Sequence, residues 1–171
     1  GGFAPWVGAL IGDVEQPILL VAPEGREEET VTRLARVGFD NALGYLNGSF
    51  EAWKKAGKAT DSVEGIDTTK LKTLSEKENL TVFDVRKPGE YLSEHLPDAK
   101  NTPLDFINEH MNEFPTGTPF YMHCAGGYRS MIAASILKSR GIHNLIDVRG
   151  GFGAIKESGM KVSDYVCPST L

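Results

Sequence analysis

The chain has 171 residues, of which 40% are hydrophobic and 24% charged, a composition typical of a globular protein with one large domain or two small ones. Its formal net charge of −5 argues against binding nucleic acid or an anionic membrane surface, and no apolar run approaches the roughly 20 residues needed to span a bilayer. The first residues lack the pattern of a signal peptide, and the two cysteines lie in unlike settings. We therefore expect a cytoplasmic protein without a structural disulfide.

In chain order, the first part predicts two strands that alternate with two helices. A strand is expected over 17–22 and a helix over 28–37, where Gly38 supplies a C-terminal stop. A second strand over 42–46 leads through a glycine turn into a final helix. Strands joined through helices in this way indicate a parallel sheet covered by helices.

The next part predicts a further strand with its own helices. Thr68 or Thr69 is expected to cap a helix that ends at Leu74, and residues 80–85 have the apolar character of a buried strand. The segments that follow are a short helix broken by proline over 88–97, an extended piece over 100–103, and a helix capped by Asp105 that ends at Phe114.

An apolar strand over 119–122 then brings Cys124 to a glycine-rich turn, and a helix is expected from Ser130. Backbone N–H groups and the positive end of a helix dipole at such a turn favour a thiolate over a thiol. Gly126 and Gly127 let several N–H groups converge on one anion, and Arg129 adds a permanent positive charge. A buried structural cysteine is the alternative, but the agreement of these features favours a reactive one.

The chain contains an internal repeat at an offset of 102 residues. Pro17–Ala22 aligns with Pro119–Cys124, and Gly48–Lys54 aligns with Gly150–Lys156. We therefore divide the chain into a first unit, residues 1–66, and a complete second unit, residues 67–171. The first unit is shorter by about one strand and its helices, so either it is degenerate or the chain was cut from a larger protein. We expect the second, a unit truncated at its N-terminus, because a half-unit would leave a sheet edge and core uncovered.

Together, several motifs resemble the rhodanese (sulfurtransferase) family. They are Asp84-Val85-Arg86, Glu90-Tyr91, His95-Leu96-Pro97-Asp98-Ala99, the loop from Cys124 to Ser130, and Val148-Arg149-Gly150-Gly151-Phe152. The resemblance implies an α/β fold, a three-layer α/β/α arrangement with a central, mostly parallel sheet. It also implies that Cys124 carries sulfur as a persulfide, without a metal or cofactor. Glu94 and Asp98 stand where the family has glycine.

The first unit also resembles this fold but has Ala22 at the cysteine position. The successive glutamates over 27–29 would repel an anionic sulfur donor. We therefore expect a structural or docking role for this unit. The order of the two units is similar to the C-terminal part of fusion proteins with an upstream metallo-β-lactamase-fold persulfide dioxygenase, so we expect an upstream domain of the same polypeptide as a partner.

The loop resembles a second family as well, the tyrosine-type phosphatases and arsenate reductases. Those enzymes place five residues between cysteine and arginine, whereas four separate Cys124 from Arg129. By the pattern of the rhodanese family that the loop resembles, the shorter loop suits a single sulfur better than a phosphate. We therefore expect transfer of sulfur from thiosulfate or a low-molecular-weight persulfide to a thiol, sulfite or cyanide. The alternative is a sulfur-relay or regulatory module of a larger persulfide-oxidising enzyme.

The resemblance assigns catalytic roles to Cys124 and Arg129. The residues expected to bind substrate are Ala125, Gly126, Gly127, Tyr128, Ser130 and Arg86, with Asp84 in a structural role beside them. For several of them a plainer role stays open. Arg129 could pair with a neighbouring acid, Ser130 could cap the helix, and Tyr128 could simply be exposed; Asp84 and Arg86 could form a scaffold ion pair, while His123, Trp6 and Trp53 are expected in the core.

Overall fold

The computed structural model of the chain describes residues 3–167 and separates into two compact units, residues 1–61 and 62–171. The division falls before the predicted boundary at residue 66. The reason is that strand β3 (Glu64–Ile66) pairs in parallel with β7 (Leu145–Val148) and so belongs to the sheet of the second unit.

The first unit contains three helices and two strands among its described residues. In chain order they are α1 (Phe3–Leu10), β1 (Ile18–Leu20), α2 (Glu27–Ala35), β2 (Ala42–Tyr45) and α3 (Ser49–Lys55). β1 and β2 pair in parallel, which confirms the predicted strand–helix–strand arrangement. The small core joins Leu20 of β1 to Leu34 of α2 and to Phe39, and α1, which the sequence did not predict, packs against the same cluster.

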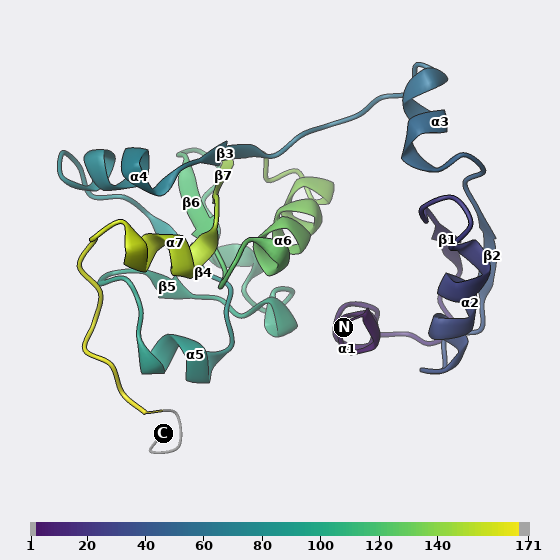
Figure 1. Cartoon of the computed structure of the whole chain (residues 1–171), viewed down its shortest axis with the longest axis horizontal. Coiled ribbons are helices and arrows are strands. Elements are labelled where there is room, and N and C mark those ends of the chain that lie inside the picture. The colour runs from purple at the N-terminus through teal and green to yellow at the C-terminus, as the bar shows by residue number, and fades with distance from the viewer. Residues whose placement is uncertain (1–2, 168–171) are drawn as a thin grey trace. The chain divides into compact units, whose positions relative to one another are not determined.

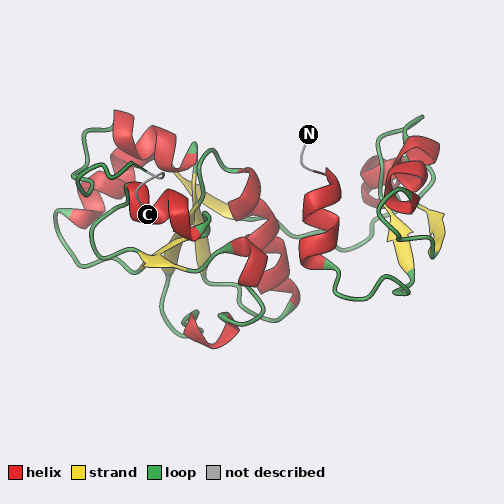
Figure 2. Ribbon diagram, turned by 90° about the horizontal axis from the view of Figure 1, so that it is seen from below, coloured by secondary structure: helices red, strands yellow, loops and turns green. Residues whose placement is uncertain are grey.

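The second unit is a five-stranded parallel sheet in the order β3-β7-β6-β4-β5. Its other elements are α4 (Thr68–Ser75), β4 (Val82–Asp84), α5 (Pro88–Ser93), β5 (Lys100–Asn101), η1 (Leu104–Phe106), η2 (Met111–Glu113), β6 (Phe120–His123), α6 (Tyr128–Ser139) and α7 (Gly151–Glu157). Every strand pair is parallel, and helices flank the strands (Figure 2), which confirms the predicted α/β fold class.

Both faces of this sheet are covered by helices. On one face, Leu71 of α4 and Ile155 of α7 pack against Tyr121 of β6 and Val148 of β7 in a single buried cluster. Helix α6 lies on the other side (Figure 1) and contacts η1. The sheet therefore carries Cys124, directly after β6, at the carboxyl end of one of its central strands.

Two predicted helix starts and one predicted helix were wrong. Asp67, not Thr68 or Thr69, caps α4, because its carboxylate accepts a hydrogen bond from the Lys70 N–H at 2.8 Å. Helix α6 begins at Tyr128, before the predicted start at Ser130. The helix predicted from Asp105 to Phe114 is replaced by the two short 3₁₀ turns η1 and η2, in a segment where two asparagines lower helix propensity.

Across residues 3–167, none of the helices combines the length and the apolar character that crossing a membrane requires.

Candidate active site

Cys124 lies at the end of β6, where the chain turns into α6, and only 1% of its surface is exposed. The backbone N–H of Gly127 donates a hydrogen bond to its Sγ atom at 3.1 Å. Open parallel sheets place ligands outside the carboxyl ends of their strands, and α6 directs the positive end of its dipole to this point. The structure therefore places the sulfur at the N-terminus of α6, the position that the sequence analysis expected for it.

Gly127 controls the turn that makes this contact. Its φ of 101° lies in the left-handed region, which glycine adopts without the steric cost of a Cβ atom. Gly127 directly precedes α6, and in this conformation its N–H points back toward Cys124. Ala125 and Gly126, which complete the turn, are exposed, whereas the Cys124 side chain beside them is buried.

A second turn, which precedes α7, contacts the cysteine loop through backbone hydrogen bonds. Gly150 and Gly151 have φ values of 77° and 58°, and the start of α7 follows. The Phe152 N–H donates to the Cys124 carbonyl oxygen at 2.7 Å, and the Gly153 N–H donates to the Ala125 carbonyl oxygen at 3.1 Å. A Cβ atom on Gly151 would collide with the Cys124 carbonyl oxygen and lie 2.8 Å from the Ala125 carbonyl carbon. The glycine pair is visible in the sequence as a motif, but its contact with the cysteine loop appears only in the structure.

Arg129 forms a two-pronged ion pair with Glu90 of α5. Its Nη1 and Nη2 atoms lie 2.5 and 2.8 Å from the two carboxylate oxygens. These hydrogen bonds are the main reason why the pKa of Glu90 lies below its usual value. Partial burial opposes this lowering of the pKa, and the Lys87 backbone N–H adds to it. The same pairing raises the pKa of Arg129, to which the nearby Cys124 charge contributes in smaller part. The structure thus realises the alternative in which Arg129 pairs with an acid, and identifies Glu90 as that acid.

Arg86 and Asp84 form a buried scaffold pair under the site. The Arg86 Nε atom lies 3.0 and 2.9 Å from the two carboxylate oxygens, and Nη2 also donates to the Glu94 carbonyl oxygen at 2.8 Å. The guanidinium carbon lies 3.8 Å from the centre of the Phe152 ring. Arg86 is only 4% exposed, so the structure favours the scaffold alternative over the predicted contact with substrate.

His123 faces the core, as predicted, and is completely buried. Its Nε2 atom lies 3.9 Å from Asp84 Oδ2 and, among the described residues, has no hydrogen-bond partner. Burial lowers the pKa of His123, and the nearby Asp84 only partly opposes this effect. His123 is therefore a packing residue, because its completely buried ring cannot reach a substrate.

Ser130 does not cap α6, because it lies inside the first turn of the helix. It is fully buried, and its hydroxyl donates to the Gly127 carbonyl oxygen at 3.1 Å. The hydroxyl of Ser130 thus satisfies the backbone of the turn from inside the helix. Burial raises the pKa of Asp147 on β7. Tyr128 is 66% exposed, which matches the plainer of its two predicted roles.

Within residues 3–167, no group of three or more histidine, cysteine, aspartate or glutamate side chains is placed to hold a metal ion.

The comparison with protein families identifies a rhodanese-like domain at residues 67–158. A protein named Sulfurtransferase from Allochromatium vinosum is 30% identical over 101 residues, which cover 58% of this chain and 94% of that protein. A protein named Thiosulfate sulfurtransferase GlpE from Pseudoalteromonas translucida is 31% identical over 81 residues, which cover 47% of this chain and 77% of that protein. The matched family region contains Cys124 and all residues of the site described above.

Among solved structures, a rhodanese-like domain protein from Staphylococcus aureus is similar in fold. It is 32% identical, with a TM-score of 0.53, and the match covers 60% of this chain and all of that one (100%). The share of this chain that is covered corresponds in size to the second unit alone.

Proposed function

The chain belongs to the rhodanese-like domain family, and from that premise we propose that it is a sulfurtransferase that carries sulfur as a persulfide on Cys124. The names of its relatives from Allochromatium vinosum and Pseudoalteromonas translucida support transfer of sulfur. The observation that carries the proposal is the hydrogen bond from the Gly127 N–H to the Cys124 sulfur at the N-terminus of α6. An N–H group in this place stabilises negative charge on a sulfur atom.

In the first half-reaction, the Cys124 thiolate attacks the outer sulfur of thiosulfate. A new S–S bond forms to Cys124 as the S–S bond of thiosulfate breaks, and sulfite leaves with the electron pair of the broken bond. A low-molecular-weight persulfide reacts in the same way, with its thiolate as the leaving group. Both routes leave an outer sulfur on Cys124, which the loop must accommodate.

In the second half-reaction, a nucleophile attacks the outer sulfur of the Cys124 persulfide. Cyanide yields thiocyanate, sulfite yields thiosulfate, and a thiolate yields a new persulfide, and each regenerates the Cys124 thiolate. The transferred sulfur leaves without the electron pair of its bond to Cys124, so no external oxidant or reductant is required.

We assign the remaining residues by their place around this sulfur. The loop from Ala125 to Tyr128 and Ser130 surrounds the persulfide, and the Gly127 N–H balances its charge. Arg129 orients an anionic donor, while Glu90 fixes the direction of its guanidinium group. Arg86 acts through the scaffold by holding Asp84 and Phe152 beneath the loop.

Intact mass spectrometry tests the proposal directly. After incubation with thiosulfate or glutathione persulfide, we expect the protein to gain the mass of one sulfur atom, and cyanide or a thiol should remove it. Cys124→Ser should abolish the gain, whereas Cys167→Ser serves as the matched control and should keep it. No gain with either donor would reject the proposal. A gain that neither cyanide nor a thiol discharges would favour the alternative, a relay module that passes sulfur only to a partner.

A further inference from the structure

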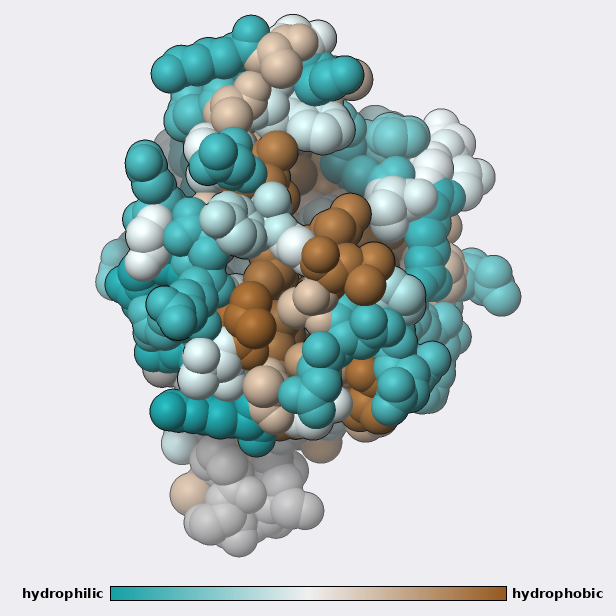
Figure 3. Space-filling view, turned by 90° about the vertical axis from the view of Figure 1, so that its right-hand side faces the viewer, coloured by the Kyte–Doolittle hydropathy of each residue, from teal (hydrophilic) through white to brown (hydrophobic). Residues whose placement is uncertain are grey.

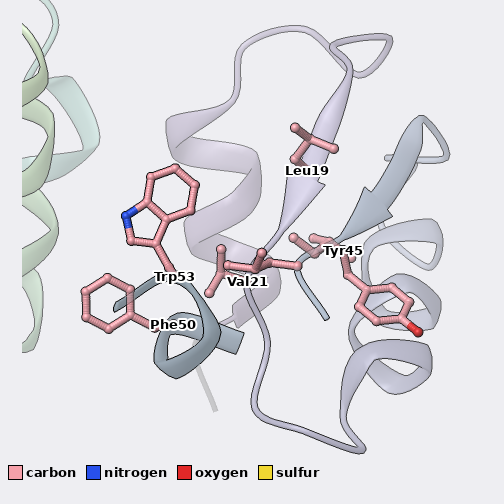
Figure 4. Close-up of a pocket in the computed structure, with 7 residues that line it drawn as sticks. Leu19, Val21, Tyr45, Phe50 and Trp53 are labelled. Carbon is pink, nitrogen blue, oxygen red and sulfur yellow. The ribbon is translucent and has the colours of Figure 1, made fainter. Parts of the chain in front are cut away.

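The first unit has an apolar hollow that none of its described residues covers. The hollow has a volume of about 460 Å³ and is lined by Leu19, Leu20, Val21, Tyr45, Leu46, Phe50 and Trp53. Leu19 is 77% exposed and Val21 61%, and Trp53, which the sequence placed in the core, is 39% exposed. Figure 4 shows these side chains around the hollow, and Figure 3 shows apolar side chains gathered on the face that this unit presents to the viewer. Exposed apolar patches of this kind mark interaction surfaces.

The second unit supplies an internal comparison for this hollow. In the first unit, Leu19 pairs with Gly44 across the two strands. The repeat offset of 102 residues carries this pair onto Tyr121 and Ile146, which are partners in the second unit. The pair Leu20 and Tyr45 is carried onto Met122 and Asp147 in the same way. The two strand pairs therefore share a register at these two positions, whereas at Ile18, which pairs with Ala42, the register of the first unit shifts by one residue relative to the pair Phe120 and Leu145.

The turn before the last helix of each unit agrees as well. Gly48 and Ser49 have φ values of 74° and 56°, and their counterparts Gly150 and Gly151 have values of 77° and 58°. Both residues of each turn thus adopt the left-handed conformation, which is uncommon for a residue with a side chain such as Ser49. This agreement supports the use of residue-by-residue equivalence between the two units.

The residues that line the hollow correspond to buried residues of the second unit. The counterparts of Leu19, Leu46, Phe50 and Trp53 are Tyr121, Val148, Phe152 and Ile155, and all four belong to one buried cluster in which none is more than 9% exposed. The side chains that cover them are Ile66, Leu71, Val82, Leu96 and Ala99. These five side chains lie on the segment 62–103, and the first unit has no described counterpart of that segment.

What the first unit does have before β1 is α1. This helix contacts α2, just as η1 contacts α6 in the second unit. α1 therefore corresponds to the segment that follows residue 103, on the face opposite the hollow. The strands agree with this assignment. In the second unit β6 lies between β4 and β7, whereas in the first unit β1 pairs with β2 alone, so the described residues include no strand that corresponds to β4. An open strand edge next to an apolar face is a site where another strand adds.

We propose that the apolar face of the first unit binds a segment of the same polypeptide that precedes Gly1. This segment supplies a strand parallel to β1 and apolar side chains that fill the hollow, as the segment 62–103 does in the second unit. The source follows from chain order, because the covering segment of the second unit directly precedes β6. A second copy of the chain is a poorer occupant, because Leu71 and Val82 of its own covering segment are already buried within its second unit.

The test compares the 171-residue chain with a version extended at the N-terminus by native sequence as long as the segment 62–103. The probes are fluorescence of 1-anilinonaphthalene-8-sulfonate and hydrogen exchange of the β1 amides. We expect the 171-residue chain to bind the dye. The extended chain should lose most of that fluorescence, and its β1 amides should exchange at least about tenfold more slowly, because they enter a cooperative core.

Two variants of the extended chain control this test. Leu19→Asp should restore dye binding and fast exchange, whereas Val14→Asp should leave both unchanged, because Val14 is 49% exposed, does not line the hollow and has an exposed counterpart, Thr116. Native upstream sequence that lacks an apolar strand would overturn the proposal. So would an extended chain that still binds the dye and whose β1 amides still exchange rapidly. A 171-residue chain that dimerises in sedimentation and excludes the dye as a dimer would also overturn it, in favour of a second copy.

Discussion

The backbone N–H of Phe152 donates a hydrogen bond to the carbonyl oxygen of Cys124 at 2.7 Å, so the start of α7 is fixed directly to the residue that we propose as the sulfur carrier. The contact requires the backbone of Gly151 to pass against the cysteine loop without a side chain. A methyl group at residue 151 would therefore push the loop away from α7. The turn after β7 is thus part of the site, although it contributes no chemical group.

Gly151→Ala should lower both stability and sulfur transfer. Ser49 holds the corresponding position of the first unit at φ 56° with a side chain, so we attribute most of the cost to the collision with the Cys124 carbonyl rather than to φ. We expect a loss of about 1–3 kcal/mol in the free energy of unfolding and at least about a tenfold loss in the rate of thiocyanate formation. Gly153→Ala is the control, because its Cβ atom would lie at an ordinary 3.6 Å from the Ala125 carbonyl oxygen. Equal behaviour of the two variants would contradict this account.

Arg86→Met should destabilise the second unit strongly. The substitution leaves the carboxylate of Asp84, which is completely buried, without its main partner. Breaking a buried pair in this way costs about 3–5 kcal/mol, whereas an exposed pair contributes about 1 kcal/mol or less. Lys87→Met is the matched control, since its ion pair with Asp105 spans 3.7 Å and its side chain is 64% exposed. Urea unfolding of both variants measures the difference, and a similar small loss in both would show that Arg86 is not a scaffold residue.

Glu90→Gln should make the loss of stability depend on pH. Because Arg129 holds the pKa of Glu90 below its usual value, the carboxylate stabilises the folded state above about pH 4.5, and this contribution is lost as the pH falls through the lowered pKa. The Glu90 side chain is 38% exposed, so screening by solvent limits the effect at pH 7 to about 0.5–1 kcal/mol. Wild type and variant should converge in acid. Thermal unfolding between pH 3 and pH 7 checks this, and a constant difference over that range would count against the ion pair as its cause.

The same substitution should weaken binding of an anionic donor. Without Glu90, the Arg129 guanidinium loses the partner that fixes its direction, so we expect a higher KM for thiosulfate with a smaller change in kcat. Arg129→Lys should show the same pattern more strongly, because an ammonium keeps the charge but not the planar fork. A normal KM in both variants would remove Arg129 from the donor site.

The sequence predicted the elements whose cause is local. The strand before Cys124 and the stop at Gly38 follow from apolar runs and glycine positions, and both are found in the structure. The pairing of Arg129 with Glu90 was left open, because the two residues are 39 apart in the chain and only the fold brings α5 against α6. The start of α6 was misplaced because it depends on the φ of Gly127, a backbone property that the residue type permits but does not impose.

Trp53 shows a different limit. Its apolar character and helical spacing predicted a core position, and its counterpart Ile155 is indeed completely buried. In the first unit the partners that would bury it are not among the described residues, so the same pattern gives a side chain that is 39% exposed. A hydrophobic pattern thus indicates which face is to be covered, but not which segment of polypeptide covers it.

Glu94 and Asp98 stand where the family has glycine, and replacing each of them by glycine should change the free energy of unfolding in opposite directions. Asp98 is exposed and has a φ of 65°, in the region where a Cβ atom is strained, whereas Glu94 has an extended φ of −169° and pairs with Lys156 at 2.5 Å. Asp98→Gly should therefore raise the free energy of unfolding by about 0.5–1 kcal/mol, since relief of the strain exceeds the entropy that glycine adds to the unfolded chain. Glu94→Gly should lower it by a similar amount or more, because no strain is relieved and the ion pair is lost. Thermal unfolding of the two variants beside wild type measures both shifts. A loss of stability in Asp98→Gly would mean that the aspartate makes a compensating contact, and that its left-handed conformation carries no net cost.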